Sequence, residues 1–268
     1  MASTAAGTYR HLIGAQARSQ ASYRTSFLID LAGNVLVVGA DLLAVLVLFR
    51  VTPELGGFAV AEVVLMFGLA GTGFALADLL VGNIERLRVY VRTGLLDAVL
   101  VRPLGVLPQL LALDFQVRRI GRLVYATSVL SFAVTYADIA WTPARVGLVV
   151  LAPLSGAVFF GAIFVAGATV AFWWVDSGEV ANAFTYGGRE FTSYPVSVYS
   201  GWFRRLFGYG LGFAFVAYYP ALGLLGRPDP LGLPAWAAWA GPAVSALAAA
   251  AAGLLWRTGV RHYRSTGS

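Results

Sequence analysis

No cysteine and no lysine occur in this sequence of 268 residues, and all 19 basic residues other than histidine are arginine. Without cysteine the chain has no disulfide framework, no thiolate nucleophile and no cysteine-based metal site. Without lysine it has no P-loop lysine, no Schiff-base lysine and no lysine anchor for pyridoxal phosphate. These absences exclude the lysine- and cysteine-based chemistries from this chain.

Histidine is also scarce, because only His11 and His262 occur, both in basic terminal segments. A histidine-based catalytic triad or a multi-histidine metal site therefore cannot be built inside a membrane. The acidic residues form no cluster with a fixed helical spacing. We expect no catalytic residue, no metal site and no enzyme activity, and a membrane-embedded enzyme is the least favoured alternative.

Charge is scarce as well: 12% of the residues are charged and 59% are hydrophobic, with a mean hydropathy of +0.75. A soluble domain is about a quarter charged. The apolar residues come in blocks near the roughly 20 residues that a helix needs to cross a bilayer. Because lipid leaves open sheet edges unsatisfied, the sequence predicts an all-α integral membrane protein of about six transmembrane helices.

The predicted division is an N-terminal cytoplasmic interface segment with a short helix (1–26), a six-span transmembrane domain (27–257) and a cytoplasmic tail (258–268). Turn residues at 52–57, Pro143 and the prolines near 228–230 separate apolar runs. Two long charged loops, 81–122 and 176–205, complete the pattern. The predicted spans are 27–49, 58–80, 123–139, 146–175, 206–225 and 235–256.

Arginine is distributed unevenly between the two sides of this arrangement. With a cytoplasmic N-terminus, only Arg50, Arg145 and Arg227 lie on the outer side, and the other arginines lie on the inner side. The positive-inside rule therefore places both termini and both long loops in the cytoplasm. A nucleic-acid partner is not expected, because the arginines are spread over separate segments rather than gathered on one soluble surface.

The second loop contains an amphipathic stretch over 84–104, which reads IERLRVYVRTGLLDAVLVRPL. Its apolar residues recur at helical spacing, and its arginines lie mostly on other faces. Such a cytoplasmic helix either lies on the membrane surface, where arginine meets anionic lipid, or docks a soluble partner. Periodicity alone favours the lipid interpretation.

Four acidic residues fall within or at the ends of the first two spans: Asp30, Asp41, Glu62 and Asp78. Asn34 lies two turns before Asp41, on the same helix face, and joins the last three as a pathway candidate. Ionised groups in lipid are costly, so they should face protein or water. They either line a pathway for a cationic or zwitterionic substrate or form hydrogen bonds between helices, and Asp41 is the best pathway candidate. Gly208 and Gly212 form a small-xxx-small pair, which indicates close helix packing or a subunit interface.

The chain resembles the ABC type 2 exporter permeases, particularly a bacterial branch of their transmembrane subunits. The resemblance covers nearly the whole chain. It departs from the family pattern at Gly201 and Gly212, where relatives often have proline. The supporting motifs are GLLDAVLVRPLGVLPQ in the second loop, Tyr194-Pro195, Trp202 with Arg204-Arg205, Tyr218-Tyr219-Pro220 and Leu225-Gly226.

This resemblance implies a permease in the bacterial plasma membrane that forms a substrate pathway with a second permease subunit. A separate ABC ATPase dimer, which carries the ATP and Mg, would drive it, and this chain would hold no cofactor. The 84–104 helix would be the main coupling helix and 177–199 a second cytoplasmic contact. An ion-gradient-driven secondary transporter is the alternative. The coupling candidates are Glu85, Arg86, Arg88, Arg92, Leu95, Leu96, Asp97, Arg102 and Pro103.

Overall fold

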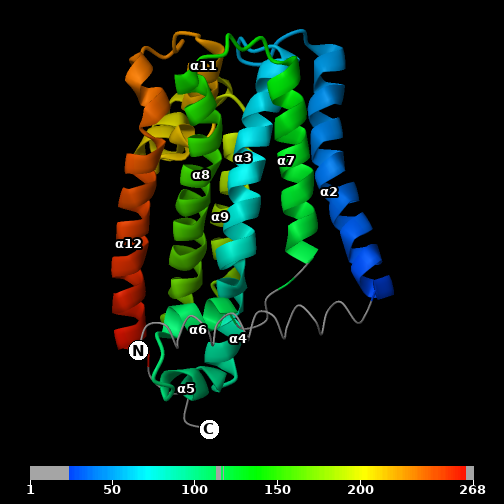
Figure 1. Ribbon diagram of the computed structural model, residues 1–268. Coiled ribbons are helices and arrows are strands. Elements are labelled where there is room, and N and C mark those ends of the chain that lie inside the picture. The colour runs from blue at the N-terminus through cyan, green and yellow to red at the C-terminus, as the bar shows by residue number, and fades with distance from the viewer. Residues whose placement is uncertain (1–23, 113–115, 117, 264–268) are drawn as a thin grey trace.

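The computed structural model describes residues 24–112, 116 and 118–263 (Figure 1). Within these residues the protein is all-helical and contains no β-strand, as expected. The predicted interface segment falls mostly outside the described residues. Five long helices run side by side: α2 (Arg24–Val51), α3 (Val60–Val81), α7 (Arg118–Tyr136), α8 (Pro143–Thr169) and α12 (Gly241–His262).

Three helices in the described part of the chain are long and apolar enough to cross a membrane: Val60–Arg92, Pro143–Phe172 and Gly241–His262. A bent pair, Gly201–Gly210 with Phe213–Leu225, makes a fourth if it is counted as one span. These helices confirm a membrane protein, while the count of six spans stays a prediction.

Helix α3 lies at the centre of the bundle (Figure 1), and its glycines let neighbouring helices approach closely. A Cβ atom on Gly73 would lie 3.2 Å from the Cα of Gly156 on α8. A Cβ atom on Gly68 would lie 2.8 Å from the Cα of Leu130 on α7. Close backbone approach of this kind supplies the van der Waals contact that holds membrane helices together.

The predicted breaks at 52–57 and at Pro143 are present. Gly56 and Gly57 adopt positive φ angles of 59° and 87° in the turn before α3. The side chain of Glu62 then accepts a hydrogen bond from the Ala59 N–H at 2.8 Å, which caps α3. At the start of α8, Thr142 caps the helix and Pro143 occupies its first turn, where proline loses no hydrogen bond.

The fifth predicted span, 206–225, is wrong as a continuous helix. The chain forms a π-helix, η4 (Arg204–Gly210), a short 3₁₀ turn, η5 (Phe213–Phe215), and α11 (Tyr218–Leu225). The two halves are bent by 62°. Gly212 causes the break, since its φ of 89° is left-handed and ends helical pairing. Gly208 and Gly212 therefore do not share one helix face.

The predicted loop at 176–205 is also wrong, because it contains helix α9 (Gly178–Ser193). This helix packs against α3 and α8 (Figure 1). After it, the Ser197 hydroxyl donates to the Gly56 carbonyl at 2.9 Å, so the segment reaches the turn between α2 and α3. Hydropathy averaging misses α9 because its glycine, threonine and asparagine residues suit packing against protein better than contact with lipid.

The remaining boundaries shift at three places. Helix α7 starts earlier than predicted, at Arg118, and α8 ends at Thr169, followed by the 3₁₀ turn η2 (Val170–Phe172). The last predicted span divides into η6 (Ala235–Trp239) and α12, whose end at His262 takes up part of the predicted tail.

Candidate functional site

Helix α3 does not stop at the membrane-spanning length. It continues through the 3₁₀ turn η1 (Gly82–Arg86) into α4 (Leu87–Arg92), so that Val60–Arg92 forms one helical segment of 33 residues. At 1.5 Å per residue this segment is about 50 Å long, whereas the hydrocarbon core is about 30 Å thick. Its last turns therefore extend beyond the apolar layer.

The chain reverses direction directly after α4. Gly94 has a left-handed φ of 71°, and it separates α4 from α5 (Leu95–Leu100). The Thr93 hydroxyl donates to the Val89 carbonyl at 2.7 Å, which closes the end of α4. The single amphipathic helix predicted over 84–104 is thus wrong, and two short helices joined by a tight turn replace it.

The two short helices present an exposed surface that mixes arginine with apolar side chains. Leu95 is 53% exposed and Val101 is 83% exposed. Among the predicted coupling residues, Leu96 is buried and Glu85 and Asp97 are half-buried. We call the exposed set the α4–α5 surface: Arg86, Arg88, Arg92, Leu95, Val101, Arg102 and Pro103.

Helix α6 (Val106–Ala112) holds α5 near η1, which follows the C-terminal end of α3. The Gln109 amide donates to the carbonyls of Val99 at 3.2 Å and Leu104 at 2.9 Å. The Asn83 amide of η1 donates to the Leu111 carbonyl at 3.1 Å. The surface is therefore fixed to α3 through hydrogen bonds as well as through the chain itself.

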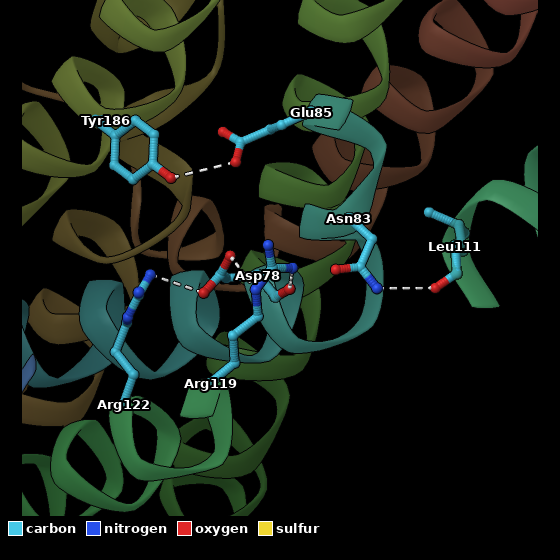
Figure 2. A network of polar contacts seen from close by, with 7 residues as sticks. All are labelled: Asp78, Asn83, Glu85, Leu111, Arg119, Arg122 and Tyr186. Atoms are coloured by element: carbon cyan, nitrogen blue, oxygen red, sulfur yellow. Dashed lines mark hydrogen bonds and ion pairs between the residues drawn. The ribbon is translucent and has the colours of Figure 1, made fainter. Parts of the chain in front are cut away.

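A buried ion cluster joins this end of α3 to α7 (Figure 2). Asp78 is only 1% exposed, and its Oδ2 lies 2.7 Å from Arg122 Nη1. Arg119 Nη1 donates to the Asp78 carbonyl at 2.6 Å, and its Nε lies 3.4 Å from Asp78 Oδ1. A Cβ atom on Gly82 would lie 2.3 Å from Arg119 Nη1, so a glycine makes room for the cluster.

Contacts with α9 extend the same cluster. The Tyr186 hydroxyl of α9 donates to Glu85 Oε2 at 3.5 Å (Figure 2). Arg92 of α4 forms an ion pair with Asp176, just before α9, and the Arg88 guanidinium lies against Gly178. The α4–α5 surface is consequently connected to three other helices: α3, α7 and α9.

The predicted pathway residues lie at three different places. Asp78 belongs to the cluster above, and Glu62 pairs with Arg227 at 2.6 Å at the opposite end of α3. Asp41 lies 3.2 Å from Arg189 of α9. The side chain of the fourth pathway candidate, Asn34, falls outside the described part of the structure. Glu62 and Asp78 thus hold segments of the chain together, which matches the structural interpretation of these acids.

Sequence reasoning missed the arginines that partner these acids. The sequence indicates only an orienting role in the membrane for three of them: Arg119, Arg122 and Arg227. The fourth, Arg189, lies in a segment that was predicted to be a loop. The spacing of Arg119 and Arg122 places them on one helix face, which is the one local signal that they act together. In the part of the chain described, no group of three or more His, Asp or Glu side chains is arranged to hold a metal ion.

A protein-family model described as "ABC-2 family transporter protein" matches residues 35–267. The match includes the α4–α5 surface, the Asp78 cluster and all of α9. No curated protein and no solved structure matches the chain.

Proposed function

Since the chain belongs to the ABC-2 family of transporter proteins, we propose that it is the membrane-spanning permease of an exporter powered by a separate ATPase. The family match confirms the resemblance found in the sequence. We propose further that two permease subunits form the pathway and that ATP and Mg bind to the ATPase alone.

One observation carries this proposal: the α4–α5 surface lies on the end of a membrane-spanning helix. Because Val60–Arg92 is one helical segment, a partner that pulls on α4 moves α3 as a rigid body. The Asp78 ion pairs pass that movement to α7, and the Arg92–Asp176 pair passes it to the start of α9. Such mechanical linkage is what ATP-driven closure of a partner requires of a permease.

The arginine distribution supports a cytoplasmic position for the α4–α5 end. Arg204 and Arg205 follow the Ser197–Gly56 contact and so lie toward the opposite end, contrary to prediction. Most of the other arginines still gather at the α4–α5 end, which agrees with the positive-inside rule. Those at that end include Arg86, Arg88, Arg92, Arg102, Arg119, Arg122, Arg257 and Arg261.

The exposed tryptophans agree with this placement in a membrane. Trp173 and Trp174 are 45% and 52% exposed beyond the end of α8. Trp141 and Trp236 are 49% and 64% exposed at the other end of the bundle. Tryptophan is enriched at both membrane interfaces, so the two groups mark the boundaries of the apolar layer.

The composition of the α4–α5 surface specifies the chemistry of the partner. Leu95 and Val101 offer apolar contact, and Arg92 and Arg102 lie beside them in the sequence. The matching ATPase surface would be a groove with an apolar floor and an acidic rim, because interfaces combine an apolar core with complementary rim charges.

An affinity pull-down of the full-length tagged chain from gently solubilised native membranes tests this function. We expect a P-loop ATPase to co-purify with the native chain, and its recovery to fall at least tenfold with Val101→Asp combined with Arg102→Glu. The matched control is Arg50→Glu, an exposed arginine at the other end of the bundle, which should leave recovery unchanged.

Two results would contradict the exporter assignment. The first is equal ATPase recovery with the native chain and with the Val101→Asp, Arg102→Glu variant. The second is transport by the purified chain alone in liposomes with only an ion gradient, which would establish the secondary transporter instead.

A further inference from the structure

A second charged cluster lies between α2 and α9, away from the α4–α5 surface. Arg189 of α9 contacts two carboxylates: its Nη2 lies 3.2 Å from Asp41 Oδ2, and its Nη1 lies 3.2 Å from Glu190 Oε1. The guanidinium carbon also lies 5.9 Å from the ring centroid of Phe67 and 5.8 Å from that of Phe74. Three helices, α2, α3 and α9, therefore meet at this cluster.

The cluster lies near the middle of the apolar layer. Phe67 and Phe74 follow the first residue of α3 by seven and fourteen positions, which corresponds to about 10 and 21 Å along the helix. The hydrocarbon core is about 30 Å thick. An ionised side chain that faces lipid at this depth costs at least about 2.5 kcal/mol.

The two carboxylates nevertheless point away from the packed interior. The Arg189 side chain is 14% exposed, whereas the Asp41 side chain is 33% exposed and that of Glu190 is 47% exposed. Because lipid contact would be costly, this face between α2 and α9 must meet water or another polar surface. It has the properties of a pathway wall rather than of a lipid-facing surface.

The surface of α9 beside the cluster is open. Ala183, Gly187 and Glu190 recur at helical spacing and are all exposed. A Cβ atom on Gly187 would meet no other atom within 4 Å. Tyr186, one turn before Glu190, is 37% exposed, and its ring centroid lies 5.5 Å from that of Phe74.

The charges of the cluster do not cancel, because two carboxylates face one guanidinium. Arg122 lines a small cavity together with Arg189, and its Nη1 is paired with Asp78 Oδ2. Among the side chains that the structure describes, the α2–α9 face thus carries two carboxylates and one guanidinium.

We propose that this face is a binding site for organic cations that carry an apolar body. Glu190 and Asp41 attract the positive charge at membrane depth. Tyr186, one helical turn before Glu190 and 37% exposed, offers an aromatic ring to the apolar part and to the cation. The inference rests on the proposed function, because it assigns a cargo class to the permease pathway.

Binding of tetraphenylphosphonium, compared with tetraphenylborate, tests the proposal, since the two ions have similar size and opposite charge. Equilibrium dialysis would use the purified full-length chain in lipid nanodiscs, with empty nanodiscs to subtract partition into lipid. We expect the native chain to bind the phosphonium ion and to bind the borate ion at least tenfold more weakly.

Glu190→Gln is the decisive variant, because it removes the excess charge and leaves the Asp41–Arg189 pair intact. We expect it to weaken phosphonium binding about tenfold. Glu179→Gln is the matched control: it makes the same change at an exposed position in the first turn of α9, about 16 Å along the helix, and should leave binding unchanged.

The proposal is overturned if the borate ion binds as tightly as the phosphonium ion, if neither binds above empty nanodiscs, or if Glu190→Gln binds like the native chain. The ATPase pull-down and the binding measurement, both made on the native chain, separate the cargo assignment from the exporter assignment. ATPase recovery without phosphonium binding removes only the cargo assignment. Phosphonium binding without ATPase recovery removes the exporter assignment and leaves the cation site.

Discussion

Buried and partly buried charges in this chain hold distant segments together. Asp78 forms ion pairs with both Arg119 and Arg122, and Glu62 forms one with Arg227. A buried ion pair adds little net stability compared with an apolar pair, but removal of one partner leaves an uncompensated charge. The loss of stability on replacing either acid therefore depends on how far its arginine stays buried without a carboxylate partner.

Asp78→Asn is expected to destabilise the protein by about 3–5 kcal/mol, because it leaves two inward-facing guanidinium groups without their carboxylate. Thermal unfolding of the purified protein in detergent measures the effect as a lower Tm. Asp138→Asn is the control, since Asp138 is exposed and its loss should shift Tm little. Equal Tm values for the two variants would show that the cluster does not stabilise the fold.

Among the helices, α3 differs from the others in continuing past the apolar layer into a turn that depends on one glycine. Gly94 has a φ of 71°, a conformation that costs other residues about 1–2 kcal/mol. The turn sets the angle between α4 and α5, and thereby the shape of the α4–α5 surface. The prediction of a single helix over 84–104 is wrong at this residue. The periodic apolar pattern continues on both sides of the glycine and so does not indicate the turn.

Gly94→Ala is expected to lower ATPase recovery in the pull-down several-fold while the chain still inserts into membranes, because strain at this position reorients α5. Gly147→Ala in α8 is the matched control, as a Cβ atom there meets nothing within 4 Å. Undiminished ATPase recovery with Gly94→Ala would mean that the partner does not depend on the geometry of the turn.

The path of the whole chain through the membrane differs from the predicted one after α8. The segment after Asp176 was expected to stay at the cytoplasmic end until the fifth span. Instead α9 runs along α3, and Ser197 contacts Gly56 near the opposite end. The bent pair that follows returns from that end into the bundle and back (Figure 1). Val198 and Val101 should therefore lie on opposite sides of the membrane.

The absence of cysteine allows a direct test with single-cysteine variants. Val198→Cys, at a side chain that is 45% exposed, should react with a membrane-impermeant maleimide in intact spheroplasts. Val101→Cys, at one that is 83% exposed, should react only after permeabilisation. Labelling of both positions under the same condition would contradict this path, and the native chain serves as the unlabelled background.

The sequence by itself determined the class of the protein, the breaks at 52–57 and Pro143, and the family. Each of these depends on composition, on local turn residues or on motifs that lie close together in the chain. Arginine counts also predict an orientation, which stays a prediction after the reassignment of Arg204 and Arg205. These properties can be predicted without knowledge of the fold, because the apolar character and the turn residues of each segment act within that segment.

Only the tertiary structure decided that α9 is a packed helix, that the predicted fifth span is broken, and which arginine meets which acid. Asp41 and Arg189 are 148 positions apart and Glu62 and Arg227 are 165 apart. No periodicity connects residues at such separations. A charge within the apolar layer must find a partner, but the partner is selected by how the helices pack, and packing depends on the whole chain.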